Sequence, residues 1–181
     1  MGVKPYEYSN RVGVRWVSWE EFVSMSGTLT EELAARDVSA VIGVARAGLF
    51  PATAISCALR CELYPVRVTR RLNDEVVHSK PVWKVPVADD VEGKIVAVVD
   101  EISDTGETLA IVSASVLAKG AKKVITATLV SHSAARPQAD VSVITSDEFI
   151  VFPWDQRVFI DGQWQAHPEI LAGLKAQQQK S

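Results

Sequence analysis

The apolar run Lys-Ile-Val-Ala-Val-Val at residues 94–99 constrains the fold of this chain more than any other stretch of its sequence. A short, continuous apolar run is typical of a strand that is covered on both faces, as in a parallel sheet. Further strand patterns at 38–44, 64–69 and 124–131 alternate along the chain with helical segments. This alternation predicts an α/β fold with a doubly wound, mostly parallel sheet and flanking helices.

The remaining elements follow from local signals. Ser18 followed by two acids predicts the start of a helix that runs towards residue 36, and Gly27 marks a point where it could break. Pro51 predicts the first turn of a helix ending near residue 59. A loop at 100–106 precedes a helix that ends near residue 119, with Gly120 as its C-cap. Shorter strands are expected at 14–17, 141–145 and 149–152.

The length of 181 residues suits one core, so we expect a single domain over 1–181. The polar stretch at 70–92 contains two prolines that prevent a long element, and we expect its middle to be mobile. The tail at 176–181 is polar and is expected to be disordered.

Charge and cysteine content limit the partners of the chain. With 19 basic and 22 acidic residues the net charge is −3, which disfavours nucleic acid and requires any polyanion to be held locally. Cys57 and Cys61 indicate a reducing compartment, and their spacing predicts packing on one face of a helix. The most apolar stretch, 41–59, is interrupted by Arg46 and Pro51 and does not predict a membrane span. We therefore expect a cytoplasmic protein.

Two loops that follow predicted strands carry the candidate chemistry, at 43–48 and 100–108. In the second loop, small and hydroxyl residues stand where a strand turns into a helix, an arrangement that lets backbone N–H groups converge on an anion. Its four acids would repel a phosphate but suit sugar hydroxyls or Mg²⁺. The loop therefore predicts a phosphorylated sugar and a metal; the plain alternative is a capped helix start with exposed acids.

Residues 96–108, Val-Ala-Val-Val-Asp-Glu-Ile-Ser-Asp-Thr-Gly-Glu-Thr, resemble the phosphoribosyl-diphosphate signature of type I phosphoribosyltransferases. Glu101 departs from the Asp usual at its position. The segments at 16–21, 41–51 and 134–155 are most similar to the 6-oxopurine group, the xanthine-guanine and hypoxanthine-guanine enzymes. The resemblance implies the type I fold with a mobile hood loop at 70–92 and a base-binding hood at 132–165.

The resemblance also implies roles for the residues of the second loop. Asp100 and Glu101 would face the ribose hydroxyls and a shared Mg²⁺, and Asp155 would help to bind a second Mg²⁺. Asp104 would accept the proton from N7 of the purine. The 5′-phosphate would be held, mainly by main-chain N–H groups, within the set Ser103, Asp104, Thr105, Gly106, Glu107 and Thr108.

The pyrophosphate is implied to meet the first loop and the hood. Arg46, Ala47 and Gly48 would bind it from the first loop, where Ala45 and Ala47 replace a Ser and a Gly of the usual pattern. In the family the peptide after this arginine can be a non-proline cis bond, which raises that possibility for Arg46–Ala47. From the hood the candidates are Arg70, Arg71 and Lys80, with an ordinary solvated charge cluster as the alternative.

For the base, the resemblance implies that Phe149 stacks on the ring and that Ile150 presents backbone groups to its edge. His132 stands where 6-oxopurine enzymes place a Lys that donates to O6. Neutral imidazole donates one hydrogen bond without a permanent charge, so hypoxanthine, guanine, xanthine and even adenine stay open. The alternatives are a core position for Phe149, a structural role for His132 and a turn position for Asp155.

The implied activity is transfer of 5-phosphoribosyl from 5-phospho-α-D-ribosyl 1-diphosphate to a purine base, with release of pyrophosphate. Two alternatives stay open: a non-catalytic regulator that binds the diphosphate sugar or a nucleotide, and an orotate- or uracil-type transferase. Family members are commonly dimers or tetramers, so a homo-oligomer is expected. The candidate interface aromatics are Trp16, Trp19, Trp83 and Trp164.

Overall fold

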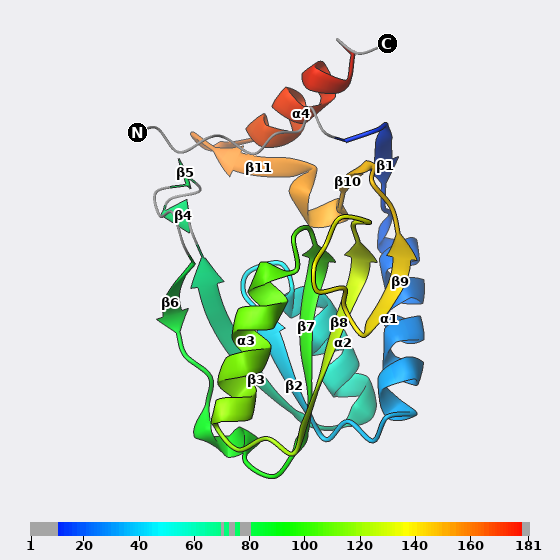
Figure 1. The fold of residues 1–181 in the computed structure, drawn as a ribbon. Coiled ribbons are helices and arrows are strands. Elements are labelled where there is room, and N and C mark those ends of the chain that lie inside the picture. The colour runs from blue at the N-terminus through cyan, green and yellow to red at the C-terminus, as the bar shows by residue number, and fades with distance from the viewer. Residues whose placement is uncertain (1–10, 70, 73–74, 77–80, 179–181) are drawn as a thin grey trace. The chain divides into compact units, whose positions relative to one another are not determined.

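A six-stranded sheet forms the centre of the larger part of the molecule (Figure 1). The computed structural model describes residues 11–69, 71–72, 75–76 and 81–178. The strands of this sheet are β2 (Ala40–Val44), β3 (Glu62–Thr69), β6 (Val82–Val85), β7 (Ile95–Ser103), β8 (Lys123–Ser131) and β9 (Val141–Thr145). Their order is β6-β3-β2-β7-β8-β9, and only β6 is antiparallel to its neighbour. The prediction of a mostly parallel α/β sheet is confirmed.

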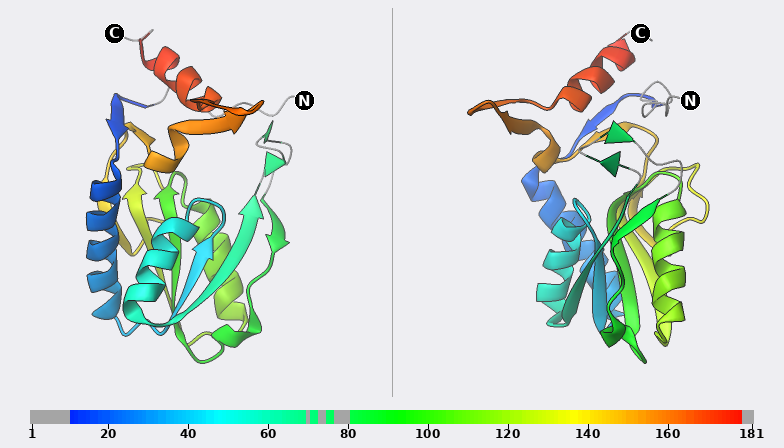
Figure 2. Two further views of the ribbon diagram at one scale, coloured as in Figure 1. Left: turned by 180° about the vertical axis from the view of Figure 1, so that it is seen from behind. Right: turned by 90° about the vertical axis from the view of Figure 1, so that its left-hand side faces the viewer.

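Helices cover both faces of this sheet. α2 (Leu49–Leu59) packs against β2 and β7, while α3 (Glu107–Ala118) packs against β7 and β8 from the other side (Figure 2). Burial on both faces explains why the central strands have continuous apolar sequences: all five residues of β2 are buried, and Val96 to Val99 have no exposed area. The apolar run therefore became a central strand, as predicted.

The chain divides into two compact units. The first is Met25–Ser146 and holds the six-stranded sheet. The described residues of the second are 11–24 and 147–178, which form β1 (Val14–Trp16), β10 (Phe149–Val151), the 3-10 turn η3 (Pro153–Asp155), β11 (Arg157–Ile160), β12 (Gln163–Ala166) and α4 (Pro168–Gln178). Here β1 pairs in parallel with β10, and β11 pairs antiparallel with β12.

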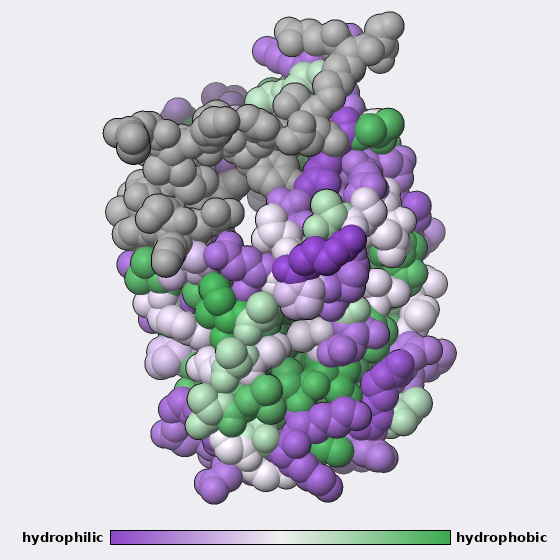
Figure 3. Space-filling view, viewed as in Figure 1, coloured by the Kyte–Doolittle hydropathy of each residue, from purple (hydrophilic) through white to green (hydrophobic). Residues whose placement is uncertain are grey.

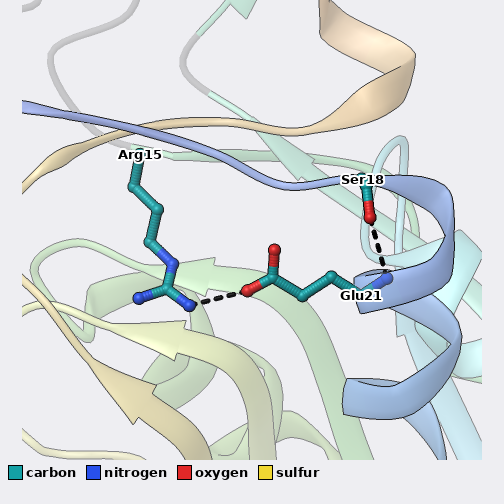
Figure 4. Close-up of polar contacts among 3 residues, drawn as sticks. All are labelled: Arg15, Ser18 and Glu21. Carbon is teal, nitrogen blue, oxygen red and sulfur yellow. Dashed lines mark hydrogen bonds and ion pairs between the residues drawn. The ribbon is translucent and has the colours of Figure 1, made fainter.

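α1 (Trp19–Ala34) begins with the cap that the sequence predicts. The Glu21 N–H donates to Ser18 Oγ at 3.0 Å, and the Arg15 guanidinium pairs with the Glu21 carboxylate at 2.6 Å (Figure 4). A serine N-cap with a glutamate three residues later is a standard helix start. The expected break at Gly27 is absent, because α1 runs through this residue without interruption.

The segment at 70–92 contains three short elements besides β6: β4 (Arg71–Leu72), β5 (Glu75–Val76) and the 3-10 turn η2 (Asp89–Val91). β4 pairs antiparallel with β5. β6 pairs with β3 through a register shift at Arg67 and Val68, so its residues belong to the edge of the main sheet.

The expectation that Cys57 and Cys61 pack together on a buried helix face is wrong. Cys57 is exposed on α2, and Cys61 lies beyond the helix end, where Arg60 takes a left-handed conformation at φ 54°. Both thiols are free, and burial raises the pKa of Cys61. No helix in the described part of the chain has the length and apolar character needed to cross a bilayer.

An apolar depression runs beside α3, away from the ends of the strands. Hydrophobic residues gather on this face of the molecule (Figure 3). The depression has a volume of about 210 Å³ and is lined partly by Leu109, Leu117 and Val124. The polar residues of its lining are Ser113, Thr126, Gln138 and Asp140, and a lining with an acid and no basic side chain does not suit a phosphorylated ligand.

Candidate active site

Gly48 brings the first candidate loop against β7. β2 and β7 are parallel neighbours, so the loops that follow them start at the same edge of the sheet. A Cβ atom at Gly48 would lie 2.7 Å from Asp100 Oδ1 and 2.5 Å from the Val44 carbonyl oxygen. Only glycine therefore lets the start of α2 approach the acid this closely.

Asp100 and Glu101 form an acid pair inside β7 rather than in a loop. The sequence places the strand end at residue 99, but β7 continues to Ser103 because its register with β8 extends to Ser131. Both acids are half-buried, and the Glu101 N–H donates to Asp100 Oδ1 at 3.0 Å. Burial, followed by repulsion from Glu101, raises the pKa of Asp100 well above its usual range.

The start of α3 forms the second candidate loop. Gly106 takes φ 83° as the N-cap of α3, and no side chain caps the helix. Thr105 Oγ1 accepts the Glu107 N–H at 3.3 Å. The first N–H groups of a helix have no partner within the helix, so the N–H groups that follow Glu107 in this turn can face an anion. Ser103 differs from its neighbours, because it is buried in β7 and its Oγ has no hydrogen-bond partner among the described residues.

The segment after β8 is fastened to this loop through main-chain contacts. The Arg136 N–H donates to the Thr105 carbonyl at 2.8 Å, and the His132 N–H donates to the Ser103 carbonyl at 2.9 Å. A Cβ atom at Gly106 would lie 2.3 Å from the Pro137 carbonyl oxygen, and the Arg136–Pro137 peptide is cis. The glycine that caps α3 therefore has no room for a side chain.

His132 lies in the interior of the first unit. Its Nδ1 is 2.5 Å from the Ser146 carbonyl oxygen. Because a carbonyl only accepts, this contact requires the Nδ1–H tautomer. The Gln138 side chain donates to the His132 carbonyl at 3.2 Å. These contacts favour the structural alternative for His132; the base-facing role stays a prediction.

The loop that carries Arg46 has an unusual peptide. The cis bond joins Ala45 to Arg46, so it precedes the arginine rather than following it. The Arg46 side chain is exposed, and the carbonyls of Arg46 and Ala47 accept N–H groups of the first turn of α2. Arg70 and Lys80 lie outside the described residues, and only the backbone of Arg71 is described.

The sequence model of the phosphoribosyl transferase domain matches residues 24–158. The chain belongs to the phosphoribosyl transferase family. The match spans both candidate loops, and it confirms the predicted resemblance and fold.

Individual relatives of this phosphoribosyltransferase support the same family assignment. A xanthine-guanine phosphoribosyltransferase of Cereibacter sphaeroides is 27% identical over 147 residues, which are 77% of this chain and 85% of that protein. The structure of a purine phosphoribosyltransferase from Pyrococcus horikoshii matches with 32% identity and a TM-score of 0.72, covering 82% and 98% of the two chains. A xanthine-guanine-hypoxanthine phosphoribosyltransferase of Helicobacter pylori shares the fold, with 22% identity, a TM-score of 0.64 and coverage of 79% and 93%.

In the second unit of this phosphoribosyltransferase, Phe149 packs in a small core with Val151 and Ile170. A Cβ atom at Gly173 would lie 2.5 Å from the Phe149 ring, so α4 lies directly on this aromatic residue. This packing favours the core alternative for Phe149. The base-stacking role stays a prediction. Ile150 is buried in β10, where its register partner is Arg15.

Asp155 and a nearby aromatic cluster also belong to the second unit. Asp155 is half-buried in η3, and its N–H donates to the Phe152 carbonyl at 3.0 Å. Trp154 stacks on Phe152, with ring centroids 4.8 Å apart and planes 8° apart, and meets Phe22 edge to face. The sequence analysis did not predict this cluster. The aromatic residues at 19–22 and 152–154 are the sequence feature that could have indicated it.

The described residues contain no group of three or more His, Cys, Asp or Glu side chains placed to hold a metal. Magnesium, however, is usually held by one or two carboxylates, with water and substrate oxygens completing its shell. The two adjacent acids of β7 fit that pattern, because a cation beside them would offset both the burial and the mutual repulsion that raise the pKa of Asp100.

Proposed function

We propose that this phosphoribosyltransferase transfers the 5-phosphoribosyl group of 5-phospho-α-D-ribosyl 1-diphosphate to a purine base and releases pyrophosphate. One observation carries the proposal: the acid pair of β7, the glycine-capped start of α3 and the loop with Arg46 and Gly48 all follow neighbouring strands of one unit at the same edge of the sheet. This combination suits a ligand with a phosphate, vicinal hydroxyls and a diphosphate. The purine-specific names of its relatives support the choice of base.

The phosphate of the sugar would bind the start of α3. Its oxygens accept hydrogen bonds from the N–H groups of the first turn, and the hydroxyls of Thr105 and Thr108 add to these. Gly106 is required because its position excludes a side chain. Ser103, Asp104 and Glu107 complete this segment, Ser103 and Glu107 through their main chains.

The ribose would lie on the acid pair. Asp100 and Glu101 would accept hydrogen bonds from its hydroxyls and would hold Mg²⁺ with them, and Asp155 would hold a second ion. When bound, magnesium neutralises charge on the diphosphate. Arg46, together with Ala47, Gly48 and the hood residues Arg70, Arg71 and Lys80, binds the pyrophosphate.

The reaction breaks the bond between C1 of the ribose and the pyrophosphate oxygen, which leaves positive charge on C1 and the ring oxygen. A purine nitrogen forms the new bond to C1. Asp104 takes the proton from N7 of the base and so keeps the nucleophilic nitrogen neutral after attack. Closure of the hood over the site excludes water, which would otherwise react at C1.

Phe149, Ile150 and His132 are the residues proposed to recognise the base, with hypoxanthine, guanine or xanthine as the expected substrates. We also propose that the two units act together as one transferase domain in the cytoplasm, where a reducing environment keeps Cys57 and Cys61 as free thiols.

A pyrophosphate-release assay tests the function. The full chain is mixed with the diphosphate sugar, Mg²⁺ and one base at a time: hypoxanthine, guanine, xanthine, adenine, orotate or uracil. We expect turnover with at least one 6-oxopurine and none with the two pyrimidines. Turnover with orotate or uracil alone would move the protein to the pyrimidine enzymes. Binding of the diphosphate sugar without turnover on any base would make it a regulator.

A further inference from the structure

The Gln138 side chain, to which the proposed reaction gives no role, holds the segment that follows β8 in its conformation. Its Nε2 donates to the carbonyls of His132, Ser133 and Ala135 at 3.2, 3.2 and 3.1 Å. Its Oε1 accepts the Ser131 hydroxyl at 2.8 Å. Because carbonyl oxygens only accept hydrogen bonds, the nitrogen of the amide must face them, and this fixes which way the amide points.

These bonds connect the segment to the central sheet. Ser131 is fully buried at the end of β8, where it is in register with both β7 and β9. The Arg136 guanidinium also donates to two of the three carbonyls, at 2.9 and 2.6 Å, but Arg136 is an exposed residue of the same segment. Gln138 therefore adds what the arginine does not supply, a link from these carbonyls to a buried strand.

The peptide group between Ala135 and Arg136 passes this restraint to the start of α3. Its carbonyl accepts a hydrogen bond from Gln138, and its N–H donates to the Thr105 carbonyl at 2.8 Å. The peptide group is planar and trans, so its C=O and N–H point in opposite directions. A side chain that fixes the carbonyl therefore also aims the N–H at Thr105.

The next peptide group, between Thr105 and Gly106, repeats this geometry. Its carbonyl is held by the Arg136 N–H, so the Gly106 N–H points to the opposite side. Gly106 is buried, and no acceptor for its N–H lies among the described residues. A buried N–H at the start of a helix suits an anion. Two rigid peptide groups in series thus connect the Gln138 amide to an N–H of the candidate phosphate site.

We propose that Gln138 is a positioning residue, whose amide orients the Gly106 N–H and with it the turn that starts α3 for the phosphate of the sugar. The inference rests on the proposed function for the identity of the ligand. The orientation itself depends only on contacts within one compact unit. Gln138 touches no reacting atom and acts through the Ala135–Arg136 and Thr105–Gly106 peptide groups.

The first test measures the ligand-free chain by NMR. Gln138→Met keeps the length of the side chain and removes its four hydrogen bonds. We expect the Arg136 N–H to exchange with solvent at least about tenfold faster, because local opening exposes it more often. The amide signal of Gly106 should shift as its peptide group loses a fixed orientation.

Thr126→Val is the matched control for this test. It keeps the shape of the side chain and removes two hydrogen bonds between Thr126 and Asp140, at the far end of the connection from β8 to β9. We expect the Arg136 exchange rate and the Gly106 signal to stay as in the wild type. Equal changes in both variants would overturn the proposal, because the effect would then be a general loosening of this connection.

The second test separates the two phosphate positions by titration. In Gln138→Met, the Kd for ribose 5-phosphate should rise at least about tenfold, as expected when a hydrogen bond to a charged group is misaligned. The Kd for pyrophosphate with Mg²⁺ should stay unchanged, because the loop with Arg46 follows β2 and makes none of these contacts. In turnover, the KM for the diphosphate sugar should rise with little change in kcat.

The outcomes distinguish this inference from the proposed function. Unchanged exchange of the Arg136 N–H in Gln138→Met would overturn the positioning role, and so would an equal loss of affinity for ribose 5-phosphate and pyrophosphate. A wild-type chain that binds neither ligand would instead contradict the proposed function. The exchange experiment would still decide the role of Gln138 in that case, because it uses no ligand.

Discussion

Asp104 is the residue whose substitution separates chemistry from binding. It is half-buried in the loop that follows β7, and we assign it the proton from N7 of the base. Asp104→Asn keeps the size and polarity of the side chain but cannot take that proton. We expect kcat to fall by about 10²–10⁴-fold, the usual contribution of a general base, with the fold and nucleotide binding retained.

This prediction is checked by pyrophosphate release alongside nucleotide titration and thermal unfolding. Asp90→Asn is the matched control, because it removes the same charge from an exposed position in η2, before the amino end of β7. Normal kcat in Asp104→Asn would remove Asp104 from the mechanism.

Asp100 makes stability depend on pH. Its pKa is raised in the folded state, so folding favours the protonated carboxyl. The stabilisation from Asp100 is therefore complete below the pKa that this carboxyl has in the unfolded chain. It is lost as the pH rises through the raised pKa of the folded state. Asp100→Asn stays neutral, so without Mg²⁺ we expect it to melt above the wild type at neutral pH, with the difference shrinking in acid. Melting temperatures from pH 4 to pH 8 test this; a variant that melts lower at neutral pH would contradict it.

At the scale of elements, Gly48 fixes how closely α2 approaches β7. Gly48→Ala would place a methyl group within 3 Å of Asp100 and the Val44 carbonyl. We expect a loss of about 1–3 kcal/mol in the free energy of unfolding, as for an overpacked site, and a higher KM for the diphosphate sugar. Urea denaturation and steady-state kinetics measure both effects; unchanged values would show that the loop yields without disturbing the acid pair.

Gly27 offers the opposite case. It lies inside α1, and a Cβ atom there would have nothing within 4 Å. Gly27→Ala should raise the free energy of unfolding by about 0.5–1 kcal/mol, because alanine restricts the unfolded chain and favours helix. The urea midpoint reports this gain, and kcat should not change. A lower midpoint would mean that the helix is distorted at this residue.

The strands of the central sheet were predictable because double-sided burial leaves an unbroken apolar run, as at Val96–Val99. The extension of β7 through Asp100 and Glu101 was not predictable from local sequence, since polar residues there look like a loop and only the partner strand β8 holds them in register. The core position of Phe149 depends on Gly173, which is distant in sequence. The cap at Ser18 depends only on a residue three positions away, so it could be predicted from the sequence.

For the whole molecule, the proposed substrate and metal should stabilise the fold together. The net charge of −3 provides no general attraction for a polyanion, so we expect binding to depend on the local N–H groups, basic side chains and metal. With Mg²⁺ and the diphosphate sugar at 100 times its Kd, linkage adds about 2.7 kcal/mol to stability. For a chain of this size that corresponds to a rise in Tm of roughly 5–10 °C.

Chelation of the metal is the control for this experiment. With EDTA in excess, both the rise in Tm and the turnover should disappear, because the acid pair alone repels the diphosphate. A thermal shift of equal size with and without EDTA would exclude a metal from sugar binding, while leaving the rest of the site intact.

The close backbone contact between Gly106 and Pro137 limits how this enzyme could be redesigned. The segment that follows β8 rests its main chain on the turn that begins α3. An engineer who lengthens or shortens the 132–138 segment to accept another base would also displace the turn that we propose binds the sugar phosphate. Exchange of side chains on an unchanged backbone is therefore the workable route to new base preferences, and libraries with insertions or deletions in this segment should return mostly inactive variants.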